Sequence, residues 1–346
     1  VMQTEAEKAM GQGIIDFWEA ARSFIADPEI PKKLAENRAS EIIPCICCCQ
    51  GCYDNVFKGK AIFCVANPRA GRESYPEYGM APALQKKKVV VIGGGPAGME
   101  AAIIAARRGH RVTLYEKEGK LGGNLLAAAV PPFKSDFDDL SRYYEAKLQK
   151  EGVEVQLGRE VAPDATEMEG ADVVILATGA TPLVPAISGA EGGNVVTAVD
   201  VLKGEKKPGG SVVIVGGGLV GSETAEYLSK KGLPVTILEM LDRIAGDMGN
   251  TIRWRHLVRL KEGGVKVVTG ATVTGIGEKG VAVTRQGEKE FYPADQVILA
   301  AGMKANANLA ATLKAKAPEF YQVGDALEPR KLGEAIQEGY CVAVKI

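Results

Sequence analysis

The chain has 346 residues, 42 of them basic and 43 acidic, and no block of like charge. This length accommodates two or three domains, and the balanced charge excludes the basic surface by which proteins bind nucleic acid or anionic membranes. No apolar run is long enough to span a membrane and no signal-peptide pattern opens the chain, so we expect a cytoplasmic protein whose partners are small molecules or proteins.

Residues 1–44 predict an incomplete structural unit. We expect a helix at residues 4–11, a short strand at 14–21, and then a loop and a helix that ends at Pro44. One and a half β–α units cannot bury their apolar faces alone, so this piece either packs on later domains or ends a larger one. Because the first residue is Val1, we also expect the chain to begin inside a longer gene product or to be a processed subunit.

Residues 44–64, PCICCCQGCYDNVFKGKAIFC, contain six of the seven cysteines. Packing does not require such a density, and a secreted disulfide framework spreads its cysteines along the chain. We expect four of these thiols to hold an iron–sulfur cluster, with zinc as the alternative because it also takes four cysteines. The residues that follow, 65–82, are rich in Pro, Gly and charge and predict a linker or a cover over the cluster.

Residues 88–116 predict a dinucleotide-binding βαβ unit. A β-branched run at 89–92 predicts a buried parallel strand, and the motif G-x-G-x-x-G follows at Gly93, Gly95 and Gly98, with a helix and a second strand that ends at Glu116. The first glycine makes the tight turn, the second lets a pyrophosphate approach the backbone, and the third lets the helix pack on the strand. The acid then binds a ribose hydroxyl.

The same pattern recurs over residues 211–239. Gly216, Gly218 and Gly221 follow a predicted strand, and Glu239 ends the next one at the spacing that Glu116 has in the first unit. Two dinucleotide sites exclude a simple dehydrogenase and predict a flavoprotein with FAD in one unit and a nicotinamide nucleotide in the other. Glu239 favours NADH over NADPH because a carboxylate repels a 2′-phosphate, although the nearby Arg243 weakens this preference.

Three further stretches complete the predicted flavoprotein. Residues 171–182 and 295–306 are each a strand that runs into a small-residue turn, and we interpret them as the crossings between the two domains. Near the end, Gly324 and Asp325 follow a short strand and precede a predicted helix. Asp325 is expected to bind flavin ribitol hydroxyls, with a plain helix N-cap as the alternative.

The distribution of reactive side chains narrows the chemistry. The two histidines, His110 and His256, are expected to be structural, and we predict no catalytic residue because the cofactors carry hydride chemistry. A disulfide reductase needs a cysteine pair beside its flavin, whereas Cys341 is the one cysteine after residue 87. The flavin must therefore pass its electrons elsewhere, and the iron–sulfur cluster is the acceptor available within the chain.

The motifs PCICCCQGC, CVANPRAGRE, KVVVIGGGPAGMEAA, VVIVGGGLVGSETA, LEMLDRIAGDMG and VGDALEPRKLGEAI together resemble the C-terminal half of the 2,4-dienoyl-CoA reductase, enoate reductase and trimethylamine dehydrogenase family. These are Old Yellow Enzyme-like proteins with an FMN-bearing (β/α)₈ barrel, a [4Fe-4S] cluster, and FAD- and NAD(P)-binding domains. The resemblance implies that residues 1–44 end such a barrel, with Ala21 and Arg22 in place of the Gly-Arg pair that helps to hold FMN phosphate. It also implies four cluster ligands, Cys45, Cys48, Cys52 and Cys64, and leaves Cys47 and Cys49 without a role.

The expected fold is α/β, with two Rossmann-like domains of the two-dinucleotide-binding flavoprotein type, preceded by a cysteine-rich Fe–S segment and the C-terminal remnant of a (β/α)₈ barrel. The expected domains are the barrel remnant 1–44, the cluster segment and linker 45–87, an FAD domain of 88–195 plus 301–346, and an NAD(H) domain of 196–300. The expected cofactor-binding residues are Gly93, Gly95, Ala97, Gly98, Glu116, Gly122, Ala177, Thr178, Gly179, Gly216, Gly218, Gly221, Glu239, Gly302, Gly324 and Asp325.

The expected function is NADH-dependent electron input, from NADH to FAD to the 4Fe-4S cluster and on to FMN in a barrel domain or subunit that reduces an enoyl or enoate-type double bond. FMN is expected only where that barrel is supplied. The trimethylamine dehydrogenase branch gives the alternative that the Rossmann domains bind ADP structurally, without NADH turnover. A flavin oxidase or diaphorase is a third possibility, for which a cluster is superfluous. Analogy at the level of the fold predicts a homo-oligomer.

Overall fold

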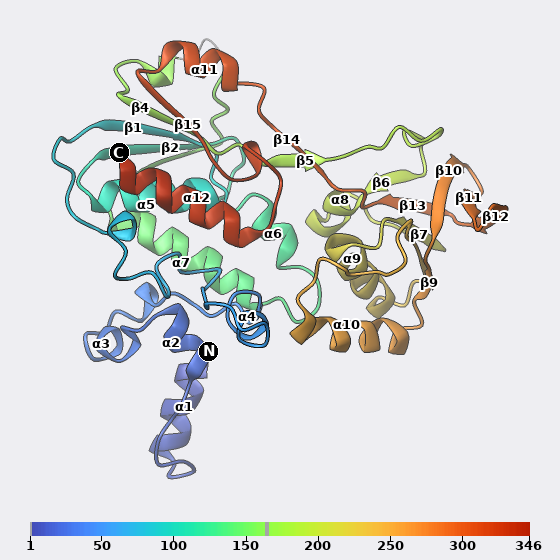
Figure 1. The fold of residues 1–346 in the computed structure, drawn as a ribbon, viewed down its shortest axis with the longest axis horizontal. Coiled ribbons are helices and arrows are strands. Elements are labelled where there is room, and N and C mark those ends of the chain that lie inside the picture. Colours follow the sequence, from blue (N-terminus) through green and yellow to red (C-terminus); the bar gives the residue numbers. More distant parts are fainter. Residues whose placement is uncertain (1, 163–165) are drawn as a thin grey trace.

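A computed structural model describes residues 2–162 and 166–346 of the chain, and its architecture rests on two parallel sheets that lie side by side (Figure 1). The first sheet has five parallel strands, in the spatial order β15 (Glu319–Gln322), β4 (Val173–Leu176), β1 (Lys88–Ile92), β2 (Arg111–Glu116) and β3 (Glu154–Leu157). Its central strands are buried on both faces, because the β-branched runs predicted at 89–92 and near 173 carry apolar side chains at every position.

The second sheet repeats this design. Its five parallel strands lie in the order β6 (Val195–Thr197), β13 (Gln296–Leu299), β7 (Val212–Val215), β8 (Val235–Leu238) and β9 (Lys266–Val268). In each sheet the strand that precedes a glycine motif is central, and the strand beside it ends at the predicted acid Glu116 or one residue before the predicted acid Glu239. The predicted α/β class with two Rossmann-type units is therefore confirmed.

Helices cover both sheets. On the first lie α5 (Pro96–Arg107), α6 (Asn124–Ala128), α7 (Asp136–Lys150), α11 (Ala310–Lys316) and α12 (Leu332–Lys345), and on the second α8 (Ala198–Lys203), α9 (Leu219–Lys230) and α10 (Asn250–Glu262) (Figure 1). Helices α5 and α12 pack closely on each other. A Cβ at Gly339 would lie 2.2 Å from the Ala97 carbonyl oxygen, so this contact requires glycine.

Two smaller sheets complete the fold. The predicted crossings end in an antiparallel pair, β5 (Ala180–Pro182) with β14 (Met303–Ala305), where the chain passes between the two large sheets. The other is an antiparallel meander of β10 (Ala271–Gly277), β11 (Gly280–Arg285) and β12 (Glu288–Pro293). These three strands were not predicted from the sequence.

The N-terminal segment differs from its prediction. The structure contains α1 (Met2–Gly11), α2 (Ala21–Ala26), α3 (Ile30–Ala35) and the 3₁₀ turn η1 (Ala39–Glu41). The predicted strand at residues 14–21 is wrong, since this stretch pairs with no strand among the described residues and leads directly into α2. The helix predicted to end at Pro44 ends instead at Ala35, shortly before Asn37 adopts a left-handed backbone with φ of 56°.

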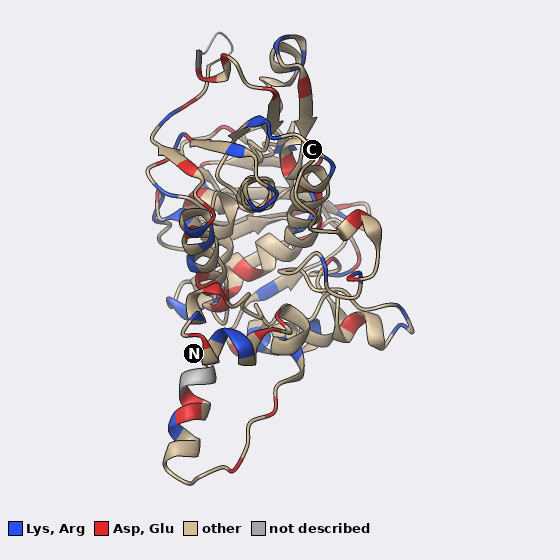
Figure 2. Ribbon diagram, turned by 90° about the vertical axis from the view of Figure 1, so that its left-hand side faces the viewer, with Lys and Arg blue, Asp and Glu red and all other residues tan. Residues whose placement is uncertain are grey.

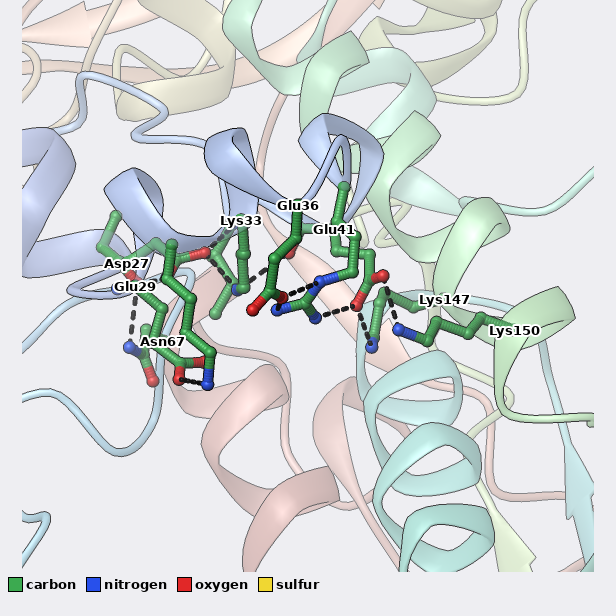
Figure 3. Close-up of polar contacts among 12 residues, drawn as sticks. Asp27, Glu29, Lys33, Glu36, Glu41, Asn67, Lys147 and Lys150 are labelled. Atoms are coloured by element: carbon green, nitrogen blue, oxygen red, sulfur yellow. Dashed lines mark hydrogen bonds and ion pairs between the residues drawn. The ribbon is translucent and has the colours of Figure 1, made fainter.

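Charged side chains attach this N-terminal segment to the first sheet's helices, as Figure 3 shows. Glu41 receives an ion pair of 2.5 Å from Lys150 and one of 3.6 Å from Lys147, both on α7. Within the segment, Asp27 pairs with Lys33 at 2.5 Å. From the linker stretch that follows the cysteines, the Asn67 amide nitrogen donates to the Ala26 carbonyl at 2.8 Å. The segment therefore packs on α7, one of the two possibilities that its sequence allowed.

The linker stretch that follows the cysteines contains one 3₁₀ turn, η2 (Pro76–Tyr78), and two more such turns, η3 (Thr166–Met168) and η4 (Gly324–Ala326), lie in the first unit. Across the part of the chain that the structure describes, no helix combines the length and apolarity needed to cross a membrane. Basic and acidic residues are interspersed over the face drawn in Figure 2, in keeping with the balanced composition.

Candidate functional site

The first glycine motif forms a turn in which each glycine has a distinct steric reason. Gly93 has φ of +111°, and a Cβ there would lie 2.2 Å from the Ala177 carbonyl oxygen. A Cβ at Gly98 would lie 2.0 Å from the Gly93 carbonyl oxygen, so α5 packs this closely on β1 only with glycine. Gly95 has no neighbouring atom within 4 Å of its added Cβ, which leaves open space at the start of α5. This open space is the expected position of a pyrophosphate.

Glu116 organises the backbone around that turn. One carboxylate oxygen accepts a hydrogen bond of 2.7 Å from the Gly94 N–H, and the other accepts one of 2.8 Å from the Glu118 N–H. The side chain is buried next to the turn. Because a carboxylate has about four acceptor positions, both oxygens keep capacity for a ribose hydroxyl.

A cavity of about 560 Å³ opens beside this turn. Half of the predicted cofactor-binding residues line it, namely Gly93, Gly95, Ala97, Glu116, Ala177, Thr178, Gly179 and Asp325. The lining also includes residues that sequence reasoning missed, such as Asn124, Arg159 and Asn306 from the first unit and Asp200 and Lys203 from α8 of the second. A glycine cradle with a mixed polar and apolar lining and an adjacent acid fits an FAD.

Three predicted residues of the first unit support the cavity without lining it. Gly98 allows the close helix packing described above, and the Gly122 N–H donates to the Gly94 carbonyl at 2.8 Å. Gly324 has φ of +64°, and its N–H donates to a Glu338 carboxylate oxygen at 2.8 Å. These glycines shape the backbone around the cavity.

Asp325 lies in the cavity wall and does not cap the C-terminal helix. The N-cap position of α12 is Lys331, and the Asp325 carboxylate accepts a hydrogen bond of 3.1 Å from the Arg330 N–H before the helix begins. Burial raises the pKa of Asp325. Of the two predicted roles, the geometry favours the one in which this acid faces a ligand.

The second glycine motif reproduces the first almost atom for atom. Gly216 has φ of +102°, and a Cβ at Gly221 would lie 2.0 Å from the Gly216 carbonyl oxygen. The Glu239 carboxylate accepts hydrogen bonds from the Gly217 N–H at 2.6 Å and the Leu241 N–H at 2.8 Å, as Glu116 does in the first unit. A Cβ at Gly218 would meet only ordinary contacts, the nearest at 3.6 Å.

The remaining predicted residue, Gly302, lies in the crossing between the sheets, directly after Ala300 and Ala301. It is close to the second turn, because a Cβ at Gly216 would lie 2.4 Å from the Ala300 carbonyl oxygen. Gly302 has φ of +111°, and its carbonyl accepts a hydrogen bond of 3.0 Å from the Leu183 N–H. Its position fits a role in holding the two crossing segments together.

The cysteine segment separates its thiols into two neighbourhoods. Cys48, Cys52 and Cys64 lie close enough to affect one another electrostatically, and burial raises the pKa of Cys48 to about 12 and also raises that of Cys64. A backbone hydrogen bond holds Cys52 and Cys64 near each other, because the Phe63 N–H, one residue before Cys64, donates to the carbonyl of Gly51, one residue before Cys52, at 2.9 Å. Among the residues that the structure describes, no three His, Cys, Asp or Glu side chains are arranged to hold a metal ion.

The other thiols gather around Arg22. The Arg22 guanidinium donates to the Cys49 sulfur at 3.5 Å, and Cys45 and Cys47 also lie within its electrostatic reach. Cys47 and Cys49 both have left-handed backbones, with φ of 52° and 56°. A hydrogen bond with Cys47 lowers the pKa of Cys45, which also lies near Cys64. Cys45 and Cys49 thus lie within electrostatic reach of both neighbourhoods, because Cys49 also affects Cys48 and Cys52, while Cys47 belongs to the Arg22 side. The segment supplies the type and number of side chains that a four-thiolate centre needs.

A buried ion pair joins the two dinucleotide units. Lys134, in the loop before α7, lies 2.7 Å from Glu223 on α9, and their side chains are 19% and 10% exposed. The preceding residue, Phe133, lies under the cations of Lys230 and Arg259, at 4.0 and 4.7 Å from its ring centre. The loop of the first unit is therefore fixed against two helices of the second.

We expect Lys134→Met to lower the free energy of unfolding by about 3 kcal/mol, because it leaves the Glu223 carboxylate buried without a partner. As a control, Arg142→Met breaks the pair with Asp139 at a position that is 68% exposed, and should cost about 0.5 kcal/mol or less. Denaturant unfolding of both variants measures the difference. Equal losses in the two variants would show that the pair between the units carries no special stability.

Two repeated glycine turns with paired acids, on two parallel sheets joined by crossing strands, define an NAD(P)H-dependent flavoprotein oxidoreductase with two dinucleotide-binding units. The family model for pyridine nucleotide-disulphide oxidoreductases matches residues 87–329, and the chain belongs to this family. The chain also corresponds to the C-terminal flavoprotein half of members of the enoate reductase and dienoyl-CoA reductase family. This confirms the resemblance that its motifs indicate. The matched residues contain no cysteine, so the disulfide chemistry in the family's name has no thiol pair here.

Several relatives match this chain over nearly all its length. It is 44% identical to an NADH oxidase of Thermoanaerobacter brockii, over 99% of this chain and 53% of the relative, and 37% identical to a cinnamate reductase of Clostridium sporogenes, over 98% and 51%. Among solved structures, a 2-naphthoyl-CoA reductase in complex with 2-naphthoyl-CoA matches with a TM-score of 0.96 and 40% identity, over 99% of this chain and 52% of that one. The chain thus spans about half the length of the curated relatives that it matches.

Proposed function

We propose that this chain is an NADH-dependent electron-input module, with FAD in the first dinucleotide unit, NADH in the second, and a [4Fe-4S] cluster on Cys45, Cys48, Cys52 and Cys64. The observation that carries the proposal is the repetition of one glycine turn and one bonded acid in both units, at Gly94 and Glu116 and again at Gly217 and Glu239. We propose the domain limits given above, with the cluster segment between the barrel remnant and the FAD domain.

When bound, FAD would supply the acceptor for one hydride, and thus two electrons, from NADH, and the cluster would supply a one-electron acceptor, so together they would divide a two-electron donor into one-electron steps. The protein's contribution is binding and positioning. The N-termini of α5 and α9 would neutralise the pyrophosphates, and Glu116 and Glu239 would orient the riboses. Asp325 would hold a polar group of the flavin chain in the cavity.

We further propose that the electrons leave through FMN in a (β/α)₈ barrel, carried by a longer chain or a second subunit, which reduces a carbon–carbon double bond conjugated to a carbonyl group. The names of two relatives, cinnamate reductase and 2-naphthoyl-CoA reductase, support an unsaturated acid or acyl-CoA as the substrate class. The balanced charge and the absence of a membrane-spanning helix from the described residues support a cytoplasmic location.

Anaerobic rapid mixing with NADH tests the electron-input role. We expect the visible flavin absorbance to bleach within a single turnover. If the flavin stays oxidised while ADP binds with the same affinity as NADH, the second unit is a structural nucleotide site and the electron-input proposal is wrong. The intact Glu239 turn favours the first outcome, because Glu239 accepts the same two backbone hydrogen bonds as Glu116 does in the first unit. The start of α9 differs in one respect, since the Leu219 N–H donates to the Asp247 carboxylate at 3.1 Å.

We expect Glu239→Ala to reduce kcat/KM for NADH by about 10–100-fold, because it removes a charged hydrogen-bond acceptor for the ribose. The same change should raise the use of NADPH relative to NADH, since no carboxylate then opposes a 2′-phosphate. Initial rates with the two nucleotides measure both effects, and Glu278→Ala, on an exposed turn of the second unit, serves as the control. An unchanged nucleotide preference in Glu239→Ala would exclude Glu239 as the selecting residue.

A further inference from the structure

Asp54 lies where the cysteine segment meets the second dinucleotide unit. It belongs to the short helix α4 (Tyr53–Val56), between Cys52 and Cys64, and is 4% exposed. One carboxylate oxygen accepts hydrogen bonds from the Thr251 N–H at 2.9 Å and from the Thr251 hydroxyl at 2.6 Å. Thr251 is in the first turn of α10, so the contact joins two segments that are 197 residues apart in the sequence (Figure 1).

This contact replaces a cap that α10 cannot provide for itself. The first N–H groups of a helix need acceptors, and a side chain at the N-cap normally supplies one. The N-cap of α10 is Gly249, which has no side chain. Asp54 supplies the acceptor together with a negative charge at the positive end of the helix. A Cβ at Gly249 would lie 1.8 Å from an Asp54 oxygen, so the start of α10 is shaped to receive this carboxylate.

Helix α10 is in turn tied to the helix of the second glycine motif. The Glu226 carboxylate on α9 is bonded by His256 Nδ1 at 2.9 Å and by Arg259 Nε at 2.6 Å, both from α10. Glu226 is almost fully buried, so this pair of contacts is shielded from solvent. The first turn of α10 and the nucleotide turn at the start of α9 therefore belong to one bonded pair of helices.

We propose that Asp54 is a positioning residue that couples the cysteine segment to the second dinucleotide unit. The cysteines on either side of Asp54, Cys52 and Cys64, are proposed cluster ligands, so an assembled cluster fixes α4, and α4 fixes α10 through Thr251. This inference rests on the proposed function, because it assumes a cluster on these thiols. Because such coupling is reciprocal, loss of the cluster should loosen the start of α10, and loss of the contact with Thr251 should loosen the cysteine segment.

Amide hydrogen exchange tests the coupling without using turnover. In the protein purified anaerobically with its iron, chelator removal of the iron should speed exchange over residues 250–253 about tenfold, since the charged acceptor for the Thr251 N–H is released. In Asp54→Ala that exchange should already be fast and should not respond to iron removal. Asp295→Ala is the matched control, because Asp295 accepts from the Ser211 N–H and hydroxyl wholly inside the second unit, and it should behave as the wild type.

Rapid mixing with NADH gives a second readout. We expect Asp54→Ala to slow flavin reduction at saturating NADH by about tenfold or more while the NADH dissociation constant changes less than about twofold, because misplacement affects hydride transfer more than binding. Asp54→Asn keeps an acceptor oxygen and should restore most of the rate.

Three results would overturn the coupling: exchange over 250–253 that ignores iron removal in the wild type, exchange in Asp54→Ala that matches the wild type, or flavin reduction that is unaffected in Asp54→Ala. Wild-type protein that carries iron but is not reduced by NADH would refute the proposed function, and the exchange comparison would still decide the coupling. Wild-type protein purified without iron would refute both.

Discussion

A Cys48→Ser variant is expected to lose its bound iron, whereas a Cys47→Ser variant is expected to keep it. The two positions are adjacent and share a segment, but the Cys48 thiol lies with Cys52 and Cys64, while the Cys47 thiol lies on the Arg22 side. A [4Fe-4S] cluster needs four thiolates, and removal of one leaves an iron without its ligand. Iron analysis of anaerobically purified protein should give about four iron atoms per chain in the wild type and nearly none in Cys48→Ser.

The Cys47→Ser and Cys49→Ser variants are the matched controls for this comparison. Neither position belongs to the proposed ligand set, so replacement by serine removes no ligand. Both residues have left-handed backbones and lie near Arg22. Iron loss in Cys47→Ser as large as in Cys48→Ser would contradict the assigned ligand set. Stoichiometric zinc in place of iron would favour the structural-zinc alternative and would remove the electron relay.

A Gly95→Ala variant is expected to fold normally but to bind FAD about 10–100-fold more weakly. Its added methyl group meets no protein atom within 4 Å, so the apoprotein has room for it. The same methyl group would occupy the space through which a pyrophosphate approaches the backbone, and overpacking of this kind costs about 1–3 kcal/mol. Thermal unfolding of the apoprotein and FAD titration separate the two effects.

Gly98→Ala is the control for Gly95→Ala, and the opposite outcome is expected. Its Cβ would lie 2.0 Å from the Gly93 carbonyl oxygen, so the apoprotein itself should lose about 3 kcal/mol of stability or fail to accumulate. If Gly95→Ala binds FAD as tightly as the wild type, the cavity beside the first turn is not the flavin site.

The dinucleotide units could be predicted from the sequence because their signals are local. Each unit is marked in the sequence by a β-branched strand, three glycines at fixed spacing and an acid at the end of the next strand. The hydrogen bonds around Glu116 and Glu239 follow from that order. The resemblance to a flavoprotein family rested on the same motifs. Local periodicity and steric need for glycine therefore determined both large sheets.

Other features depend on contacts that no local pattern encodes. Residues 14–21 have apolar positions typical of a strand, yet no described strand lies beside them, so pairing overrides propensity. The meander carries a usable signal, since Gln286 and Gly287 form a two-residue turn with φ of 52° and 86° that joins β11 to β12. The cap from Asp54 to Thr251 and the cavity residue Lys203 arise from long-range packing, for which a single sequence gives no spacing rule.

Electron paramagnetic resonance of the protein frozen after anaerobic mixing with NADH tests the central claim most directly. We predict that a reduced-cluster signal appears after the flavin absorbance bleaches, and that it is absent from Cys48→Ser. A flavin that bleaches fully with NADH while the cluster signal appears only after addition of a strong chemical reductant would contradict the proposed relay from flavin to cluster.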